Sequence, residues 1–206
     1  MYIPSKYKNE DLSEVKDFIR SNAFAILINQ LNGKPWATHT PLELDKDKDG
    51  HDILIGHIAR ANPQWKAFEA NSEVLCIFNG PHSYVSSSWY KEEEVPTWNY
   101  IAVHIYGSLT VMTESEVLTW LGGLVDHYEK DEKTPLSIKD LSPATLRQVK
   151  GVVGFRIKIN QIQAAYKLSQ GREEDHTRII HELQNKKDPG SRQVSHIMKK
   201  RGNKKT

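Results

Sequence analysis

Residues 56–65, GHIARANPQW, combine a cation, a histidine and an amide at a point where a strand-like run ends and a helix begins. Asn62 followed by Pro63 is a typical helix start. The first turn of a helix offers free backbone N–H groups that attract phosphate. Arg60 could bind such an anion through two nitrogens, and His57 could donate to it. The stretch predicts an anion site; a simple helix cap beside a surface arginine is the alternative.

Residues 79–90, NGPHSYVSSSWY, place hydroxyl groups between aromatic rings. Ser86 and Ser88 would share one face of an extended segment that leads into Trp89. A row of small hydroxyls beside aromatic rings suits an aromatic ligand with polar edges; a serine-rich turn is the alternative. A serine nucleophile is disfavoured, because no G-x-S-x-G sequence is present.

Three shorter motifs supply the remaining candidates. They are Thr38 and His39 in ATHTP, Trp98 and Asn99 in VPTWNY, and Lys167, Ser169 and Gln170 in KLSQGR. Tryptophan offers a flat stacking surface and asparagine both donates and accepts, although both could simply enter a strand core. The KLSQGR motif could bind an anion or only connect the last strand to a helix.

Metal chemistry is not expected. The nine histidines form no H-E-x-x-H pair, and the single cysteine excludes C-x-x-C. Cys76 lies in the apolar run VLCIF, so we predict a buried core residue without an intramolecular disulfide. A reducing cytoplasm is the simplest compartment for such a chain.

The elements that would hold these motifs are mostly short strands joined by turns. Strand patterns cover residues 23–31, 36–44, 52–58, 74–78, 99–111 and 152–162, and helix patterns cover 10–21, 113–128 and 173–184, with short helices from 62 and 142. Asn32-Gly33 predicts a hairpin. Hairpin-linked strands with inserted helices predict a mainly β, α+β fold: an antiparallel barrel with peripheral helices.

Length and composition favour one soluble domain. The chain has 206 residues, of which 38% are hydrophobic and 26% charged. No apolar run approaches the roughly 20 residues of a membrane span, and no apolar leader opens the sequence. A net charge of +2 does not indicate nucleic-acid binding by itself. Residues 186–206 are strongly basic, so we expect a disordered tail there; contact with DNA or an acidic partner is the alternative.

Seven motifs in order resemble the PaiB family of bacterial regulators. They are MYIPSKY (1–7), ATHTP (37–41), GHIARANPQW (56–65), FNGPHSYVSSSWY (78–90), VPTWNY (95–100), GVVGF (151–155) and KLSQGR (167–172). The resemblance runs to about residue 185 and implies an FMN-binding split barrel over 1–185. It also implies a homodimer with flavin in the crevice between subunits, and negative transcriptional regulation of sporulation and degradative (protease) genes.

The resemblance carries residue roles with it. Thr38 and His39 would pass beside the isoalloxazine. The phosphate turn would consist of His57, Arg60 and Asn62, although commoner flavin split barrels place Thr, Ser and Lys there. The rest of the pocket would be lined by Ser86, Ser88 and Trp89, reached by Trp98 and Asn99, and closed by Lys167, Ser169 and Gln170.

Two other functions are compatible with the sequence. The chain could be an FMN-dependent oxidoreductase or flavin reductase, in which the flavin carries the chemistry. Haem in place of flavin is a further alternative, because some split barrels bind haem. Direct DNA reading lacks a helix-turn-helix signature, so regulation could be indirect.

Overall fold

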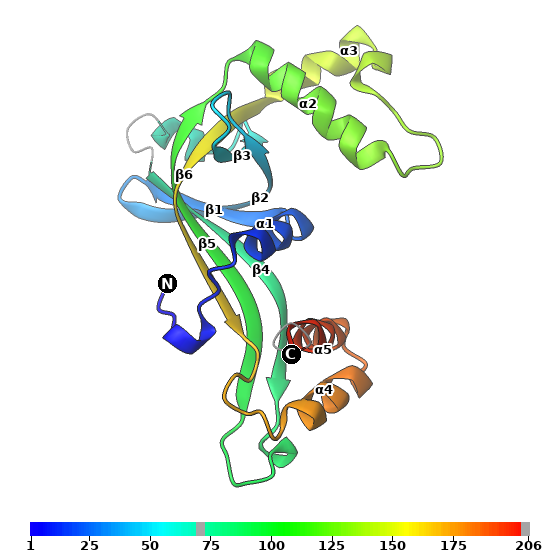
Figure 1. Cartoon of the computed structure of the whole chain (residues 1–206). Helices are drawn as coiled ribbons and strands as arrows, with labels where there is room; N and C mark the ends of the chain where they lie inside the picture. The colour runs from blue at the N-terminus through cyan, green and yellow to red at the C-terminus, as the bar shows by residue number, and fades with distance from the viewer. Residues whose placement is uncertain (69–72, 203–206) are drawn as a thin grey trace. The chain divides into compact units, whose positions relative to one another are not determined.

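The computed structural model describes residues 1–68 and 73–202 and contains a closed antiparallel barrel (Figure 1). Its strands are β1 (Phe24–Leu31), β2 (Lys34–Lys46), β3 (Asp52–Ala59), β4 (Glu73–Val85), β5 (Thr97–Val111) and β6 (Val152–Lys167). Their order around the barrel is β1-β2-β3-β6-β5-β4. The mainly β barrel predicted from the sequence is therefore confirmed.

The helices are inserted between strands or follow them. They are α1 (Leu12–Ser21), α2 (Glu114–Glu129), α3 (Pro143–Leu146), α4 (His176–Asn185) and α5 (Pro189–Gly202), with 3-10 turns η1 (Ser5–Tyr7), η2 (Pro63–Ala67), η3 (Ser87–Trp89), η4 (Ile138–Asp140) and η5 (Arg147–Gly151). Among the described residues, no helix is long and apolar enough to span a membrane.

The chain forms two compact units that share the three long strands. Unit 1 comprises Met1–Asn22, Ile77–His104 and Ile162–Thr206, and unit 2 comprises Ala23–Cys76 and Ile105–Gln161. Strands β4, β5 and β6 each contribute residues to both units. The candidate site residues fall into both units.

The first hairpin of unit 2 forms where the sequence predicts it. Asn32 and Gly33 both have positive φ angles, 53° and 74°, as a two-residue hairpin turn requires. The first part of β2 pairs with β1, from Lys34↔Leu31 to Pro41↔Phe24, and Leu42–Lys46 then pair with β3. Both prolines of β2 therefore lie in the part that pairs with β1.

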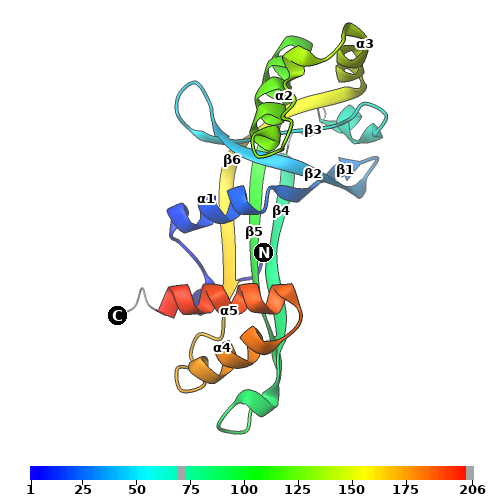
Figure 2. The same cartoon turned by 90° about the vertical axis from the view of Figure 1, so that its right-hand side faces the viewer.

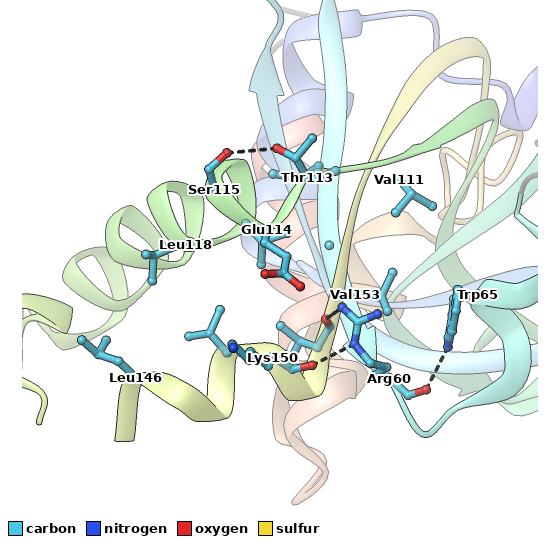
Figure 3. A pocket seen from close by; sticks show the side chains of 15 residues that line it. Arg60, Trp65, Val111, Thr113, Glu114, Ser115, Leu118, Leu146, Lys150 and Val153 are labelled. Carbon is cyan, nitrogen blue, oxygen red and sulfur yellow. Dashed lines mark hydrogen bonds between the residues drawn. The ribbon is translucent and has the colours of Figure 1, made fainter. Parts of the chain in front are cut away.

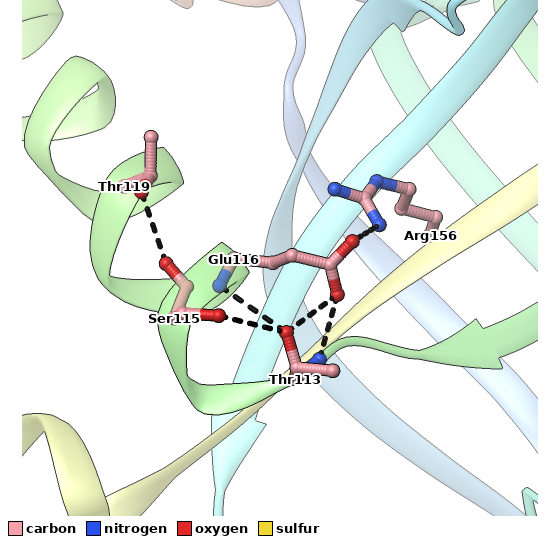
Figure 4. Close-up of polar contacts among 5 residues, drawn as sticks. All are labelled: Thr113, Ser115, Glu116, Thr119 and Arg156. Atoms are coloured by element: carbon pink, nitrogen blue, oxygen red, sulfur yellow. Dashed lines mark hydrogen bonds and ion pairs between the residues drawn. The ribbon is translucent and has the colours of Figure 1, made fainter.

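The first turn of helix α2 is hydrogen-bonded to β6 within unit 2. The spacing of Thr113 and Glu116 predicts a capping box, which forms, and Arg156 Nη1 of β6 donates to Glu116 Oε1 at 2.7 Å (Figure 4). The Thr113 backbone N–H, and after it Arg156, lower the pKa of Glu116 to about 2. Helical spacing predicts a core-facing side of α2 made of Val117, Leu118, Leu121, Leu124 and Val125. Val117 is buried, Leu118 is 44% exposed, and the other three are partly buried.

The basic segment 186–206 is not disordered over its described part, which corrects our expectation. Helix α5 lies beside α4 in unit 1 and buries Val194 and Met198 completely (Figure 2). Ser195 Oγ donates to the Ile180 carbonyl at 3.0 Å. The basic composition hid an i, i+4 apolar pair whose burial offsets the entropy cost of ordering the segment. Residues 203–206 lie outside the described residues.

Candidate functional site

Thr38 and Asn62 meet on one side of β3 in unit 2. Asn62 Nδ2 donates to Thr38 Oγ1 at 2.8 Å, and Thr38 Oγ1 donates to Gln64 Oε1 at 2.5 Å. Asn62 Oδ1 also accepts the Gln64 backbone N–H at 3.0 Å, so it is the predicted N-cap, here of the 3-10 turn η2. The structure thus joins β2 to the turn after β3 through predicted site residues.

Gln64 holds this network together and was missed by sequence reasoning. Its side chain is fully buried, and its Nε2 donates to Asn29 Oδ1 at 3.0 Å and to the Leu27 carbonyl at 3.2 Å. A buried amide must be hydrogen-bonded to be tolerated. The sequence did not predict that Gln64 is buried, because a glutamine in the first turn of a predicted helix has no feature that indicates burial. Gln64 does belong to the GHIARANPQW motif.

An exposed flat surface lies on the face of β2 opposite to Thr38, because successive side chains of a strand point to opposite faces. The rings of Phe24 on β1 and His39 on β2 stack with centroids 6.2 Å apart and 26° between their planes. Phe24 is 68% exposed, although it is a large apolar side chain. An exposed aromatic pair of this kind is typical of a surface that another flat group or another chain covers.

Arg60 hydrogen-bonds to backbone carbonyls at and next to the start of β6, the strand on the other side of β3 from β2. Its Nε donates to the Lys150 carbonyl at 2.8 Å and its Nη2 to the Val152 carbonyl at 3.1 Å, at the start of β6. Strand β3 lies between β2 and β6, so Arg60 bonds to the β6 side, whereas Asn62 bonds to the β2 side. The structure therefore does not join Arg60 to the Thr38–Asn62 network.

His57 is half-buried against helix α2. Its ring meets the Trp120 ring edge-on, with centroids 5.7 Å apart. Burial lowers the pKa of His57, so the imidazole is neutral near pH 7. Its Nδ1 is buried and has no hydrogen-bond partner among the described residues. Such an unpaired polar atom in a fold is a plausible contact for a ligand.

The candidates of unit 1 form two groups. Asn99 is fully buried and its Nδ2 donates to Ser169 Oγ at 2.8 Å, which joins β5 to the loop after β6. At the end of β6, Lys167 Nζ donates to Thr97 Oγ1 at 2.5 Å, and in the loop that follows, Gln170 Nε2 donates to the Tyr166 carbonyl at 2.5 Å. These hydrogen bonds connect the end of β6 and the loop after it to β5, and the loop to the end of β6.

The second group lies at the end of β4. Ser86 and Ser88 hydrogen-bond each other through their hydroxyls at 2.9 Å, and Ser86 caps η3. Lys186 Nζ lies 4.9 Å from the centroid of the Trp89 ring. Trp98 is 54% exposed and lies 6.0 Å from the Tyr84 ring. This end of unit 1 therefore presents aromatic rings at its surface.

Comparison with known proteins decides the family. A family model described as "Putative FMN-binding domain" matches residues 1–161. The Bacillus subtilis (strain 168) protein named "Protease synthase and sporulation protein PAI 2" is 46% identical over 200 residues, covering 96% of each chain. This chain belongs to the PaiB family. The PaiB similarity covers more than the first 185 residues that the motifs indicated, and so includes part of the basic segment. A further relative, "Uncharacterized protein AN0679" of Emericella nidulans, is 27% identical and covers 98% of each chain.

Solved structures share the fold of this PaiB-family chain. The flavocytochrome Anf3 from Azotobacter vinelandii superposes with a TM-score of 0.62 at 17% identity, covering 83% of this chain and 75% of that one. The FAD and heme binding protein from Mycobacterium smegmatis gives a TM-score of 0.58 at 14% identity, covering 83% and 79%. These similarities confirm the split-barrel fold class.

Proposed function

We propose that this PaiB-family protein binds FMN on the β2 side of β3. The observation that carries the proposal is the exposed Phe24–His39 stack, in which His39 follows Thr38 of the Thr38–Asn62 network along β2. A tricyclic ring needs a flat surface, and its polar edge and ribityl chain need donors and acceptors. The description of the matching family supports the same ligand.

The residues of this surface fit the ring and the ribityl chain better than the phosphate. Asn62 and Thr38 offer amide and hydroxyl groups that Gln64 holds in place. His39 offers a face, and His57 a neutral imidazole with an unpaired Nδ1. Bound flavin would supply electron transfer; these side chains would bind and orient it. The phosphate would need a cation outside the Thr38–Asn62 network.

A second copy of the chain is part of the proposal. We infer a homodimer in which the exposed aromatic end of unit 1, with Trp98 and Tyr84, covers the flavin of the partner. The exposure of Trp98 at 54% and Tyr84 at 41% supports a role for these rings in contact with another group.

For the biological role, we propose the regulation that the name of the Bacillus relative suggests, namely of protease synthesis and sporulation. Helix α5 supports contact with a polyanion, because Arg192, His196, Lys199 and Lys200 recur on its exposed side while Val194 and Met198 are buried. Oxidoreductase or flavin reductase activity is the alternative.

Purification without added cofactor, followed by mass spectrometry of the released small molecule, tests flavin binding. We expect the released molecule to be FMN. Release of haem would refute the proposal, and so would a protein that fails to bind FMN when FMN is added.

His39→Ala should weaken FMN binding about tenfold because the substitution removes a stacking partner. A stacked aromatic contact contributes roughly 1–3 kcal/mol. The exposed His51→Ala is the matched control.

Oxidation of NAD(P)H by the holoprotein would favour the oxidoreductase alternative.

A further inference from the structure

A second pocket of unit 2 lies on the β6 side of Arg60, away from the Thr38–Asn62 network. Its volume is about 490 Å³, within the roughly 300–1,000 Å³ of small-molecule sites. Most of its wall is aliphatic and comes from the end of β5, the first turns of α2, the α3–η5 segment and the start of β6. These apolar side chains are Val111, Met112, Val117, Leu118, Leu146, Val149, Val152 and Val153.

One part of the pocket is cationic and held in place. The Arg60 guanidinium is fixed by the carbonyls of Lys150 and Val152 and lies 5.8 Å from the Trp65 ring centroid (Figure 3). The Trp65 indole N–H in turn donates to the Arg60 carbonyl at 2.8 Å. Two of five guanidinium N–H groups are used, and the others stay available to an anion. No carboxylate of the described residues forms an ion pair with Arg60 or Lys150.

The charge in the pocket suits a monoanion. Arg60 and Lys150 contribute two positive charges, and Glu114 contributes one negative charge from the start of α2. Figure 3 shows the Glu114 carboxylate on the side of the pocket where Arg60 and Lys150 lie. The net charge of +1 is compensated by a single carboxylate, and the planar guanidinium matches carboxylate geometry.

The pocket fits a flavin poorly. A flavin carries a long ribityl chain and a polar ring edge, whereas the uncharged polar side chains of this wall are Thr113, Ser115 and the Trp65 indole. Thr113 Oγ1 donates to Glu116 Oε2 at 2.8 Å and lies 3.2 Å from Ser115 Oγ. The remaining wall is aliphatic, so the occupant needs an apolar body.

We propose that this pocket binds a small amphipathic carboxylate, with its carboxylate on Arg60 and Lys150 and its aliphatic or aromatic body against α2 and the start of β6. Arg60 then serves this ligand and not the flavin phosphate. Occupancy would connect α2, the α3–η5 segment and β6 through one molecule, because all three contribute to the wall.

Isothermal titration of the protein as purified, with octanoate as the probe, tests the proposal. We expect saturable octanoate binding, with octanol and acetate each at least about tenfold weaker, because octanol lacks the charge and acetate the apolar body. Lys150→Met keeps the carbonyl that holds Arg60 and should weaken octanoate about tenfold. Glu114→Gln removes the like charge and should strengthen octanoate several-fold.

The exposed Lys139→Met is the matched control and should leave octanoate binding unchanged. Absent octanoate binding, or equal affinity in wild type, Lys150→Met and Glu114→Gln, would overturn the proposal. Competition between octanoate and FMN would also overturn it, because the pocket would then be the flavin site. The flavin absorbance of each sample separates the two claims: FMN retained without octanoate binding refutes the pocket alone, and octanoate binding without any FMN affinity refutes the flavin proposal alone.

Discussion

Gln64 is the residue on which the β2 side of the proposed flavin surface depends. In Gln64→Leu, the Thr38 hydroxyl loses its acceptor and the Asn29 side-chain oxygen loses its donor. Each unpaired buried polar group costs about 1–3 kcal/mol, so we expect a loss of roughly 2 kcal/mol or more in the free energy of unfolding, measured in urea. The exposed Gln30→Leu on β1 should change it by less than about 0.5 kcal/mol. Equal effects of both substitutions would contradict this assignment.

His57 should make the folded state sensitive to acid. Burial lowers its pKa below the usual value near 6.5, so the unfolded chain binds the proton more tightly than the folded one. The stability contributed by the neutral ring is therefore present above about pH 6.5 and is lost as pH falls below that value. His57→Gln should flatten the fall in the urea midpoint between pH 7 and pH 5. The pKa of His104 is lowered by burial as well, so a slope of the same sign should persist until His104→Gln is added. An unchanged slope in the double variant would contradict the prediction.

The sequence predicted side-chain hydrogen bonds within one helical turn, but it did not predict which polar side chains are buried against distant residues. The cap by Asn62 and the capping box of Thr113 and Glu116 follow from spacing within one turn, and both are present. Residue type and the family resemblance make Asn99 and Ser169 candidates for ligand contact. In the structure they bond each other across 70 residues of sequence, a partnership that no local pattern contains.

At the scale of elements, α2 docks on β6 only because residue 154 has no side chain. A Cβ at Gly154 would lie 2.5 Å from Val117 Cγ2, so Gly154→Ala must move the first turn of α2. Overpacking of this kind costs about 1–3 kcal/mol, which thermal unfolding should show as a lower Tm. Gly123→Ala in the same helix meets no atom within 4 Å and should raise stability by up to about 1 kcal/mol, since alanine is the better helix former. Effects of the same sign for both would refute this packing argument.

Element types and starts followed from the sequence more closely than element faces. The 32–33 hairpin, α1 and the helix start at Ser142-Pro143 all formed as predicted. Of the apolar face that helical spacing predicts for α2, Val117 is buried and Leu121 packs partly buried against the same cluster, whereas Leu118 is exposed. Composition also concealed the ordered α5, whose two buried apolar residues stand among lysines and arginines.

For the whole molecule, the sequence predicted an antiparallel barrel but not which strands pair to close it. The β1–β2 and β2–β3 pairs are hairpins between neighbours in sequence. The pair that continues the barrel joins β3 to β6, for example Gly56 to Phe155, across about a hundred residues that include β4, β5 and α2. Period-two patterns assign strands but carry no information on such distant partners.

The exposed basic side of α5 leads to a prediction for the binding of nucleic acid by this chain. If this side binds phosphates, the affinity for duplex DNA should fall linearly with the logarithm of salt concentration. The triple change Arg192→Gln, Lys199→Gln and Lys200→Gln should reduce that slope by about 2–3, at roughly 0.9 for each phosphate that the helix no longer neutralises. The substitutions leave Val194 and Met198 in place, so the packing of α5 on unit 1 should survive. A triple change of the exposed Lys48, Lys133 and Lys139 to Gln keeps the same net charge and removes no charge from α5. Equal slopes for the two triple variants would show that net charge alone drives binding, and that α5 is not the surface that meets a polyanion.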